Sequence, residues 1–350
     1  MSFINPHRFP IISFIIIGVT IEMALVLLLP RLRVGSALTL LLLLLLLLLM
    51  AYTAHHHVRI SRTGGNGEAL DPRHVALHQT PHVLFFNRVP KCGSEMLVLL
   101  LQWLQARNGF RHVRLKNSVR RYLTRDEQAA LVEEVGERLQ ESPEPRVSFD
   151  RHVYFTNFSN HGFKMPLYLN LVRDPVEKVA SRFYYARVTP RPGAATPPGY
   201  TRPAPPRYTS LEECLQHHDP ECTFLPGHMY DLTIPYFCGH KEFCRELNNE
   251  AALREAKRQV EAWFPVVGIL EEVNVTLAVL QHRLPHYFAG VLDLYHNDLL
   301  AAPHYNMNQQ RPPTSPEVEA ALRTNISLEY DFYNFLKQRL VKQYLELPVT

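Results

Sequence analysis

The stretch that decides the fold is FFNRVPKCGSEMLVLLLQWL, which runs from Phe85 to Leu104. Its apolar start has the pattern of a strand, and its end has the spacing of a helix. Between them is a tight turn that carries Lys91, Gly93 and Ser94. Many proteins hold a phosphate in this way, because the N–H groups at a helix N-terminus attract an anion. The loop lacks the GxxxxGK[ST] spacing of an ATP or GTP site, so it predicts a phosphate ligand of another kind.

Strand and helix patterns alternate along the rest of the chain. The segment from Leu167 to Val172 is nearly all apolar, as in a buried parallel strand, and Asp174-Pro175 then begins a helix. The patterns predict strands at 82–88, 151–155, 167–172 and 265–270, and helices at 95–105, 124–140, 175 onward, 248–263, 273–284 and 327–345. This alternation is typical of a three-layer α/β fold around a mainly parallel sheet.

The N-terminal part of the chain has a different composition. Residues 34–54 include a leucine run without charge, and about twenty such residues suffice for a helix to cross a membrane. A cleaved signal peptide is the alternative, which the late start of the run disfavours. We therefore predict a tail with an apolar stretch at 1–33, a transmembrane helix at 34–54, a stem at 55–80 and a lumenal catalytic domain at 81–350. Whether 11–29 also spans the membrane stays open.

The cysteines and the sequons bear on the compartment. Four of the five cysteines fall within a short segment rich in turn formers and would form two short loops if paired in order; they are Cys214, Cys222, Cys238 and Cys244. A zinc site is the alternative, but no pair has C-x-x-C spacing, so disulfides are favoured. Three sequons, at Asn157, Asn274 and Asn325, agree with a lumenal location. We expect this part of the chain to lie in an oxidising lumen.

A second motif, RDPVEKVASRF, follows the apolar strand. Arg173 ends that strand, and Ser181 lies about two turns into the next helix, so the two side chains can grip one further phosphate. Each motif alone also fits an ordinary surface turn. The net charge of +4 is small for 350 residues, so any acidic ligand is met by a local cluster, and no nucleic acid partner is predicted.

The two motifs together resemble the paired signature of sulfotransferases that use 3′-phosphoadenosine-5′-phosphosulfate. Five segments resemble, in order, the hexuronic acid 2-O-sulfotransferases, which are Golgi type II membrane enzymes that modify glycosaminoglycans: FFNRVPKCGS, RHVYF, LVRDPVEKVASRFYYAR, IPYFCGHKEFC and FPVVGILEEVNVTLAVLQHRLPHYF. The resemblance covers Val83 to Leu340. The KCGS loop is more similar to uronyl 2-sulfotransferases of dermatan and chondroitin sulfate than to heparan enzymes, which usually have threonine where Cys92 stands.

The resemblance implies a P-loop-like sulfotransferase fold and a donor site in two halves. It implies a 5′-phosphosulfate loop made of Lys91, Cys92, Gly93 and Ser94, and a 3′-phosphate site made of Arg173 and Ser181. It also implies that Cys214 pairs with Cys222 and Cys238 with Cys244, which leaves Cys92 as a thiol. By the same resemblance, the catalytic domain lies in the Golgi lumen behind a single-pass type II anchor, and the subunits form a homotrimer.

The reaction is a direct displacement at sulfur with two electrical demands. A fixed cation must stabilise the departing nucleotide oxygen, and Lys91 fits by position. A base must take the proton of the sugar hydroxyl, and His152 in DRHVYF matches the family's base. Asp150 stands where the heparan enzymes have a second histidine, so it either orients His152 or marks different substrate contacts. An ordinary histidine pKa predicts that activity falls as pH drops through about 6.5.

The acceptor is expected to meet arginines. Arg88, beside the phosphate loop, suits a uronate carboxylate, with a strand-end salt bridge as the alternative. Arg202 and Arg207, in a proline-rich loop, suit a polyanion, with a surface loop as the alternative. The sequence thus predicts sulfation of the 2-hydroxyl of iduronate or glucuronate in dermatan or chondroitin sulfate, without a metal. The alternatives are a heparan sulfate 2-O-sulfotransferase and an inactive membrane-anchored glycan-binding protein.

Overall fold

The computed structural model describes residues 79–116, 120–187, 207–300 and 311–348. No helix within these ranges is both long enough and apolar enough to cross a membrane. The transmembrane helix predicted at 34–54, the tail at 1–33 and all but the end of the stem at 55–80 lie outside the described residues.

The described residues form one five-stranded sheet, and all of its strand pairs are parallel. The strands are β1 (Gln79–Asn87), β2 (Arg111–Arg114), β3 (Val147–Arg151), β4 (Met165–Val172) and β5 (Val266–Ile269). Their order across the sheet is β2-β3-β1-β4-β5. The central strand β1 therefore lies between β3 and β4, and the carboxyl ends of these three strands meet at one edge, where parallel α/β sheets bind ligands.

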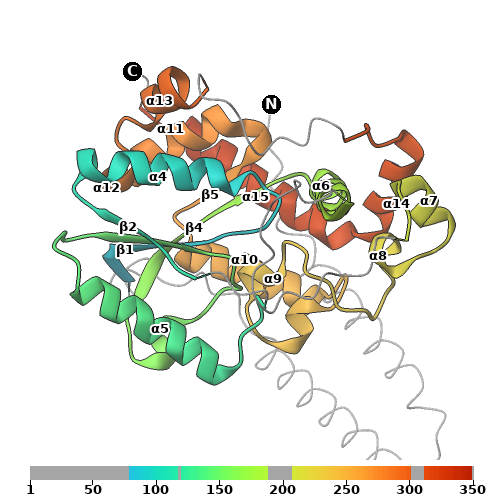
Figure 1. The fold of residues 1–350 in the computed structure, drawn as a ribbon, viewed down its shortest axis with the longest axis horizontal. Coiled ribbons are helices and arrows are strands. Elements are labelled where there is room, and N and C mark those ends of the chain that lie inside the picture. The colour runs from blue at the N-terminus through green and yellow to red at the C-terminus, as the bar shows by residue number, and fades with distance from the viewer. Residues whose placement is uncertain (1–78, 117–119, 188–206, 301–310, 349–350) are drawn as a thin grey trace, which may run out of the picture. The chain divides into compact units, whose positions relative to one another are not determined.

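Helices cover both faces of the sheet (Figure 1). One face carries α4 (Ser94–Asn108), α11 (Val273–Arg283), α12 (Pro285–Phe288) and α13 (Val291–Leu294). The other carries α5 (Arg125–Gln140), α9 (Pro235–Cys238) and α10 (Glu250–Trp263), while α15 (Ser327–Leu345) packs along β5. The α/β class, the parallel sheet and the three layers predicted from the sequence are confirmed.

A smaller core lies beside the main one. It is built by α6 (Pro175–Arg187), α7 (Leu211–Gln216), α8 (Pro220–Thr223) and α14 (Pro316–Asn325). Its apolar residues include Val179, Phe183 and Leu322, all buried. Short helical turns complete the chain at η3 (Phe158–His161), η4 (Glu242–Arg245), η5 (Leu270–Glu272) and η6 (Tyr295–Leu299). The segment after Arg173 is therefore anchored at one end by β4 and at the other by α6, which packs into this smaller core.

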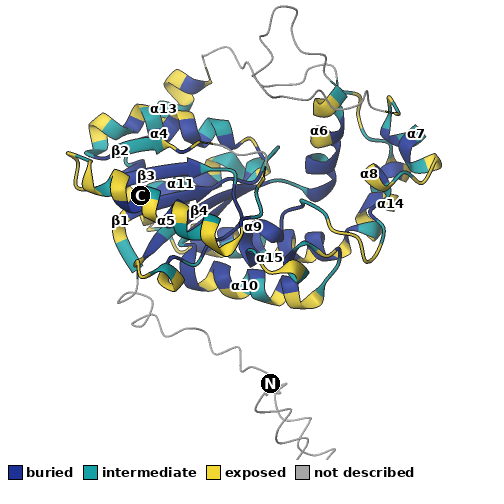
Figure 2. Cartoon of the chain, turned by 60° about the horizontal axis from the view of Figure 1, so that its bottom comes forward, coloured by how far each residue is buried: buried dark blue, intermediate teal, exposed yellow. Residues whose placement is uncertain are grey.

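The strands form the buried centre of the domain, shown in dark blue in Figure 2. Apolar side chains from β1 and β4, such as Phe85, Phe86 and Leu169, are fully buried. Polar residues share this centre, among them Asn87, Arg88 and Asp150. Buried polar groups require hydrogen-bond partners and are costly in a core. These residues therefore indicate a functional region at the ends of the strands.

Candidate active site

The loop between β1 and α4 is held in an unusual conformation. Lys91 and Gly93 have φ values of 65° and 68°, in the left-handed region that residues other than glycine seldom adopt. Cys92, between them, is a buried thiol, and the backbone N–H of Arg173 hydrogen-bonds with it. Burial raises the pKa of this thiol to about 12, so it is a packing residue and not a nucleophile. The predicted donor loop is thereby joined to the end of β4.

Lys91 extends from this loop toward α6. Its ammonium lies over the ring of Tyr185, with Nζ 3.6 Å from the ring centroid. Burial, with a smaller effect from the charge of Arg173, lowers the pKa of Lys91 to about 8. A cation that is partly desolvated and close to a second cation has unmet electrostatic attraction for an anion. This is the environment that a phosphate-binding lysine requires.

A cluster of charges lies at the start of α6, where the sequence predicts a second phosphate site. Arg173 pairs with Glu177 at 2.7 Å, and Arg311 pairs with the same carboxylate at 2.7 Å. Ser181 lies half-buried one turn further along α6. Sequence reasoning missed Arg311, because it lies far along the chain and belongs to no recognised motif. Two guanidiniums that share one carboxylate fit a doubly charged phosphate group, because that group supplies more negative charge than Glu177 alone.

His152 lies directly after β3, next to the loop. Its Nδ1 is 2.9 Å from the backbone carbonyl of Arg88. A carbonyl only accepts, so Nδ1 carries the hydrogen and the basic lone pair of the neutral ring is on Nε2. Burial, followed by the positive charge of Arg88, lowers the pKa of His152 to about 4. With this pKa the ring is neutral over the whole physiological range, which moves the activity loss expected near pH 6.5 to lower pH.

The structure does not support a carboxylate-binding role for Arg88. Its side chain is 2% exposed. The guanidinium donates to Asp150 at 2.7 Å, to Ser94 Oγ at 3.1 Å and to Glu95 at 2.5 Å. The alternative interpretation, a strand-end salt bridge, describes its position. All three nitrogens of this guanidinium are thus hydrogen-bonded within the protein, and its burial separates it from an acceptor in solution.

Asp150 makes its contacts away from His152. Beyond Arg88, its carboxylate meets Arg114 Nε at 3.2 Å and His112 Nε2 at 3.2 Å. Although burial opposes ionisation, hydrogen bonds from His112 and Arg88 hold the pKa of Asp150 below its usual range. Of the two interpretations of Asp150, direct orientation of His152 is therefore not seen. Its negative charge raises the pKa of His152, but this effect is smaller than the opposite effect of the charge of Arg88.

Two buried asparagines, which sequence reasoning also missed, support the start of the loop. Asn170 on β4 donates to the backbone oxygen of Asn87 at 2.7 Å and accepts from the N–H of Val89 at 3.3 Å. Asn87 in turn donates to the carbonyl of Tyr236 at 2.6 Å. These bonds fix the first residues after β1, so the loop leaves the sheet in one direction.

The remaining predicted site residues are spread more widely. Arg207 is an exposed residue with Asp219 3.6 Å away, and Arg202 lies outside the described residues. Among the sequon asparagines, Asn274 is exposed, Asn157 accepts from the N–H of Ser159, and Asn325 donates to the carbonyl of Thr223. The acceptor-binding and glycosylation roles stay predictions.

The disulfides implied by the resemblance are present. Cys214 is bonded to Cys222 and Cys238 to Cys244. These four sulfurs are therefore not thiolate ligands, and the zinc alternative for them is wrong. The second bridge encloses His240, whose Nδ1 accepts from the N–H of Leu123 at 3.0 Å. Its other ring nitrogen lies 3.1 Å from Thr156 Oγ1, so the bridge supports the segment that follows His152.

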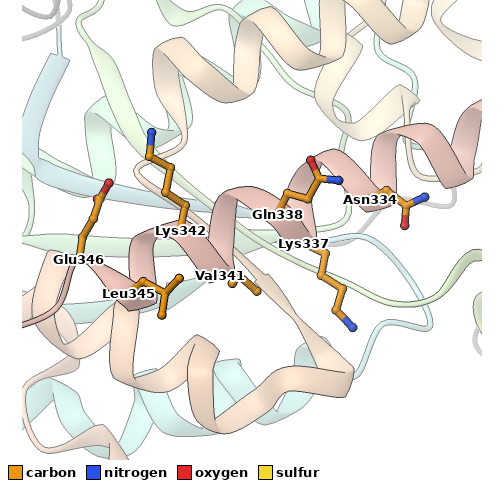
Figure 3. Close-up of a pocket in the computed structure, with 7 residues that line it drawn as sticks. All are labelled: Asn334, Lys337, Gln338, Val341, Lys342, Leu345 and Glu346. Atoms are coloured by element: carbon orange, nitrogen blue, oxygen red, sulfur yellow. The ribbon is translucent and has the colours of Figure 1, made fainter. Parts of the chain in front are cut away.

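A shallow groove lies elsewhere, along the outer face of α15 (Figure 3). Its lining consists of Asn334, Lys337, Gln338, Val341, Lys342, Leu345 and Glu346. None of the predicted donor-site or base residues lines it. The carboxyl ends of β1, β3 and β4, and not this groove, carry the candidate chemistry.

The comparison with known proteins agrees with this geometry. A model of the sulfotransferase family matches residues 76–335. The chain belongs to the sulfotransferase family. Human uronyl 2-sulfotransferase is 36% identical over 79% of this chain and 67% of its own length, and a Drosophila melanogaster uronyl 2-sulfotransferase homologue is 34% identical over 75% of this chain and 53% of its own length. A heparan sulfate 2-O-sulfotransferase of Caenorhabditis elegans is 28% identical over 73% and 76%.

The chain thus spans between about half and two thirds of the length of the uronyl relatives. The part that matches the sulfotransferase family includes all five strands, the loop at Lys91, and both Arg173 and Arg311. The candidate site of this sulfotransferase is therefore within the region that defines its family.

Proposed function

We propose that this sulfotransferase transfers a sulfuryl group from 3′-phosphoadenosine-5′-phosphosulfate to the 2-hydroxyl of a uronic acid in dermatan or chondroitin sulfate. The observation that carries the proposal is the convergence of a phosphate loop and a neutral histidine base at the ends of neighbouring strands. Arg88 and His152 follow the paired residues Asn87 and Arg151, and they are bonded to each other. The higher identity to uronyl 2-sulfotransferases than to a heparan enzyme supports the choice of polymer.

The residues of the chain fit the nucleotide donor. Lys91 and the first N–H groups of α4 suit its 5′-phosphosulfate, while Arg173, Ser181 and Arg311 suit its 3′-phosphate. The donor supplies the sulfuryl group and a phosphate leaving group. Lys91 stabilises the charge that grows on the leaving oxygen, which is a role realised mainly in the transition state.

The base acts on the acceptor. His152 Nε2 takes the proton of the sugar hydroxyl while that oxygen forms its bond to sulfur and the bond between sulfur and the leaving oxygen breaks. The Nδ1–H bond to the carbonyl of Arg88 keeps the ring in the required tautomer and supports the positive charge that the ring acquires. The proton thus ends on His152 and the negative charge on the nucleotide.

The cell-biological setting is part of the same proposal. Two disulfides support an oxidising compartment, because such bonds persist in secretory organelles. We infer a Golgi membrane protein with a single type II anchor at 34–54, a lumenal catalytic domain and a homotrimeric assembly.

One experiment tests the activity. The chain is incubated with radiolabelled donor and, separately, dermatan sulfate, chondroitin sulfate, heparan sulfate and their desulfated forms, followed by disaccharide analysis. We expect label at the 2-position of uronic acid in dermatan or chondroitin disaccharides. Label in heparan disaccharides alone would establish the heparan alternative. Glycan binding with neither donor binding nor transfer would establish the inactive glycan-binding alternative.

A further inference from the structure

Arg88 connects the two halves of the candidate site. Its three side-chain contacts belong to different elements: Asp150 is on β3, Ser94 begins α4, and Glu95 follows it. Each contact uses a different nitrogen of the guanidinium. The planar group therefore fixes the start of α4 against the end of β3 in both distance and orientation, which a flexible ammonium cannot do.

The backbone of the same residue orients the base. Its carbonyl accepts from His152 Nδ1 at 2.9 Å, and its N–H donates to the carbonyl of Arg151 at 2.9 Å. Both polar groups of the Arg88 backbone are therefore hydrogen-bonded at the end of β3, the N–H to Arg151 and the carbonyl to His152. A displacement of the Arg88 side chain would move the carbonyl that selects the tautomer of His152.

The Arg88 side chain also holds the end of the donor loop, through Ser94. Ser94 Oγ accepts from Arg88 Nε, so the hydroxyl hydrogen of Ser94 is directed to another acceptor. Ser94 is buried, and it begins the helix whose N-terminus faces the loop at Lys91. Lys91 lies three residues after Arg88, so the arginine anchors the loop at its entry and at its exit.

The ion pair is built to persist. Asp150 is 1% exposed, and His112 and Arg114 also contact its carboxylate. Buried ion pairs contribute little net stability over apolar residues, but a single partner left alone is strongly unfavourable. Such a pair therefore fixes geometry more than it stabilises the fold. Here it fixes the position of the donor loop relative to His152.

We propose that Arg88 is a positioning residue that sets the placement of His152 relative to the donor loop. The inference deepens the proposed function and rests on it. In a displacement at sulfur, the base acts on the attacking hydroxyl and the cation acts on the leaving oxygen. The distance between the base and the cation must therefore be correct in the transition state. A misplacement of about 1 Å in such an arrangement costs on the order of 10²-fold in rate.

The test must separate positioning from binding and from folding. Arg88→Met alone leaves Asp150 as a buried charge, so the main variant combines Arg88→Met with Asp150→Asn, which removes both charges together. Arg258→Met is the matched control, because it removes an arginine that pairs with Glu255 on the surface of α10. Arg88→Lys tests whether charge alone is sufficient.

Kinetics provide the first measurement. With the double variant we expect kcat to fall about 30- to 100-fold while the acceptor KM stays within about threefold of wild type. Arg88→Lys should not restore kcat, and Arg258→Met should match wild type. An acceptor KM raised tenfold or more with kcat preserved would overturn the proposal and return Arg88 to substrate binding.

The second measurement needs no turnover. ¹⁵N spectra of labelled histidine, with the His152 signal assigned by its absence in His152→Gln, report its tautomer and its titration. The charged groups that face His152 are Arg88, Arg121 and Asp150. Wild type should show a single Nδ1–H tautomer. The double variant should show a mixture of the two neutral tautomers.

The outcomes separate the two ideas. A tautomer and kcat that both equal wild type in a folded double variant would overturn the positioning role. If wild type transfers no sulfate but its His152 tautomer still depends on Arg88, the proposed function fails while the structural link between the two residues stands.

Discussion

The ring of Tyr185 lies over the ammonium of Lys91, with Nζ 3.6 Å from the ring centroid. The ring is 65% exposed, and a cation–π contact at such a site contributes about 0.5 to 1 kcal/mol. We predict that Tyr185→Leu lowers kcat about two- to fivefold, because Lys91 loses its lateral restraint. Tyr185→Phe keeps the π face and should match wild type. Equal losses in both variants would point to the hydroxyl instead of the ring.

The lowered pKa of Lys91 predicts a proton linked to donor binding. With a pKa of about 8, Lys91 is half protonated at pH 8, and bound phosphate oxygens favour its charged form. Binding of adenosine 3′,5′-bisphosphate at pH 8 should therefore take up roughly half a proton. Calorimetry in buffers of different ionisation enthalpy measures this uptake. It should be absent in Lys91→Met, and uptake that persists in that variant would assign the proton to another group.

Arg173 and Arg311 should act mainly on donor affinity. A charge-assisted hydrogen bond contributes about 1.5 to 3 kcal/mol, so Arg173→Ala or Arg311→Ala should raise the donor KM about 10- to 100-fold. A phosphate far from sulfur is held similarly in the ground and transition states, so kcat should change little. Arg258→Ala is the control. A loss confined to kcat in either variant would remove that arginine from the 3′-phosphate site.

The pH dependence of activity should be flat through the mildly acidic range. His152 has a pKa of about 4, and the neutral ring is the base, so kcat/KM should hold down to about pH 5 and be halved near pH 4. Initial rates at constant ionic strength from pH 4 to 8 measure this. His152→Ala should lose about 10²- to 10⁴-fold in kcat with donor affinity preserved. An acidic limb near pH 6.5 in wild type would mean that another histidine controls the rate.

The two disulfides should differ in their effects. Each closes a short loop and contributes roughly 2 kcal/mol to the free energy of unfolding. Replacement of Cys238 and Cys244 by serine should lower both stability and kcat, because that loop carries His240. Replacement of Cys214 and Cys222 should lower stability alone. Urea denaturation and initial rates measure both quantities, and equal kcat losses for the two pairs would contradict the difference.

The sequence predicted the parts of the fold that have strong local patterns. The helix at 327–345 and the turn from β4 into α6 are found where the apolar spacing placed them. The strand after Arg146 was expected at 151–155 but is formed by Val147–Arg151, because its Ser148 and Asp150 face buried polar partners and break the apolar pattern. The four-residue strand Arg111–Arg114 is too short and too polar to be recognised.

The sequence predicted those site residues that lie in recognisable motifs. Lys91, His152 and Arg173 stand in recognisable segments, and the structure brings the elements that carry them together. The pairing of Arg88 with Asp150 and that of Arg311 with Glu177 join residues that are distant in the sequence, and no local signal encodes them. Non-local pairing also explains why the strand order was not predicted.

The position of β1 at the centre of the sheet has a consequence for biosynthesis. Asn87 is bonded to Asn170, which lies 83 residues later, and Arg88 to Asp150, which lies 62 residues later. At typical translation rates, roughly 3 to 17 s separate the synthesis of these partners. The nascent chain must therefore keep an apolar strand unpaired during that interval, when strand edges are prone to aggregate. Variants that weaken β4 should consequently reduce the yield of folded protein before they reduce the specific activity of the protein that does fold.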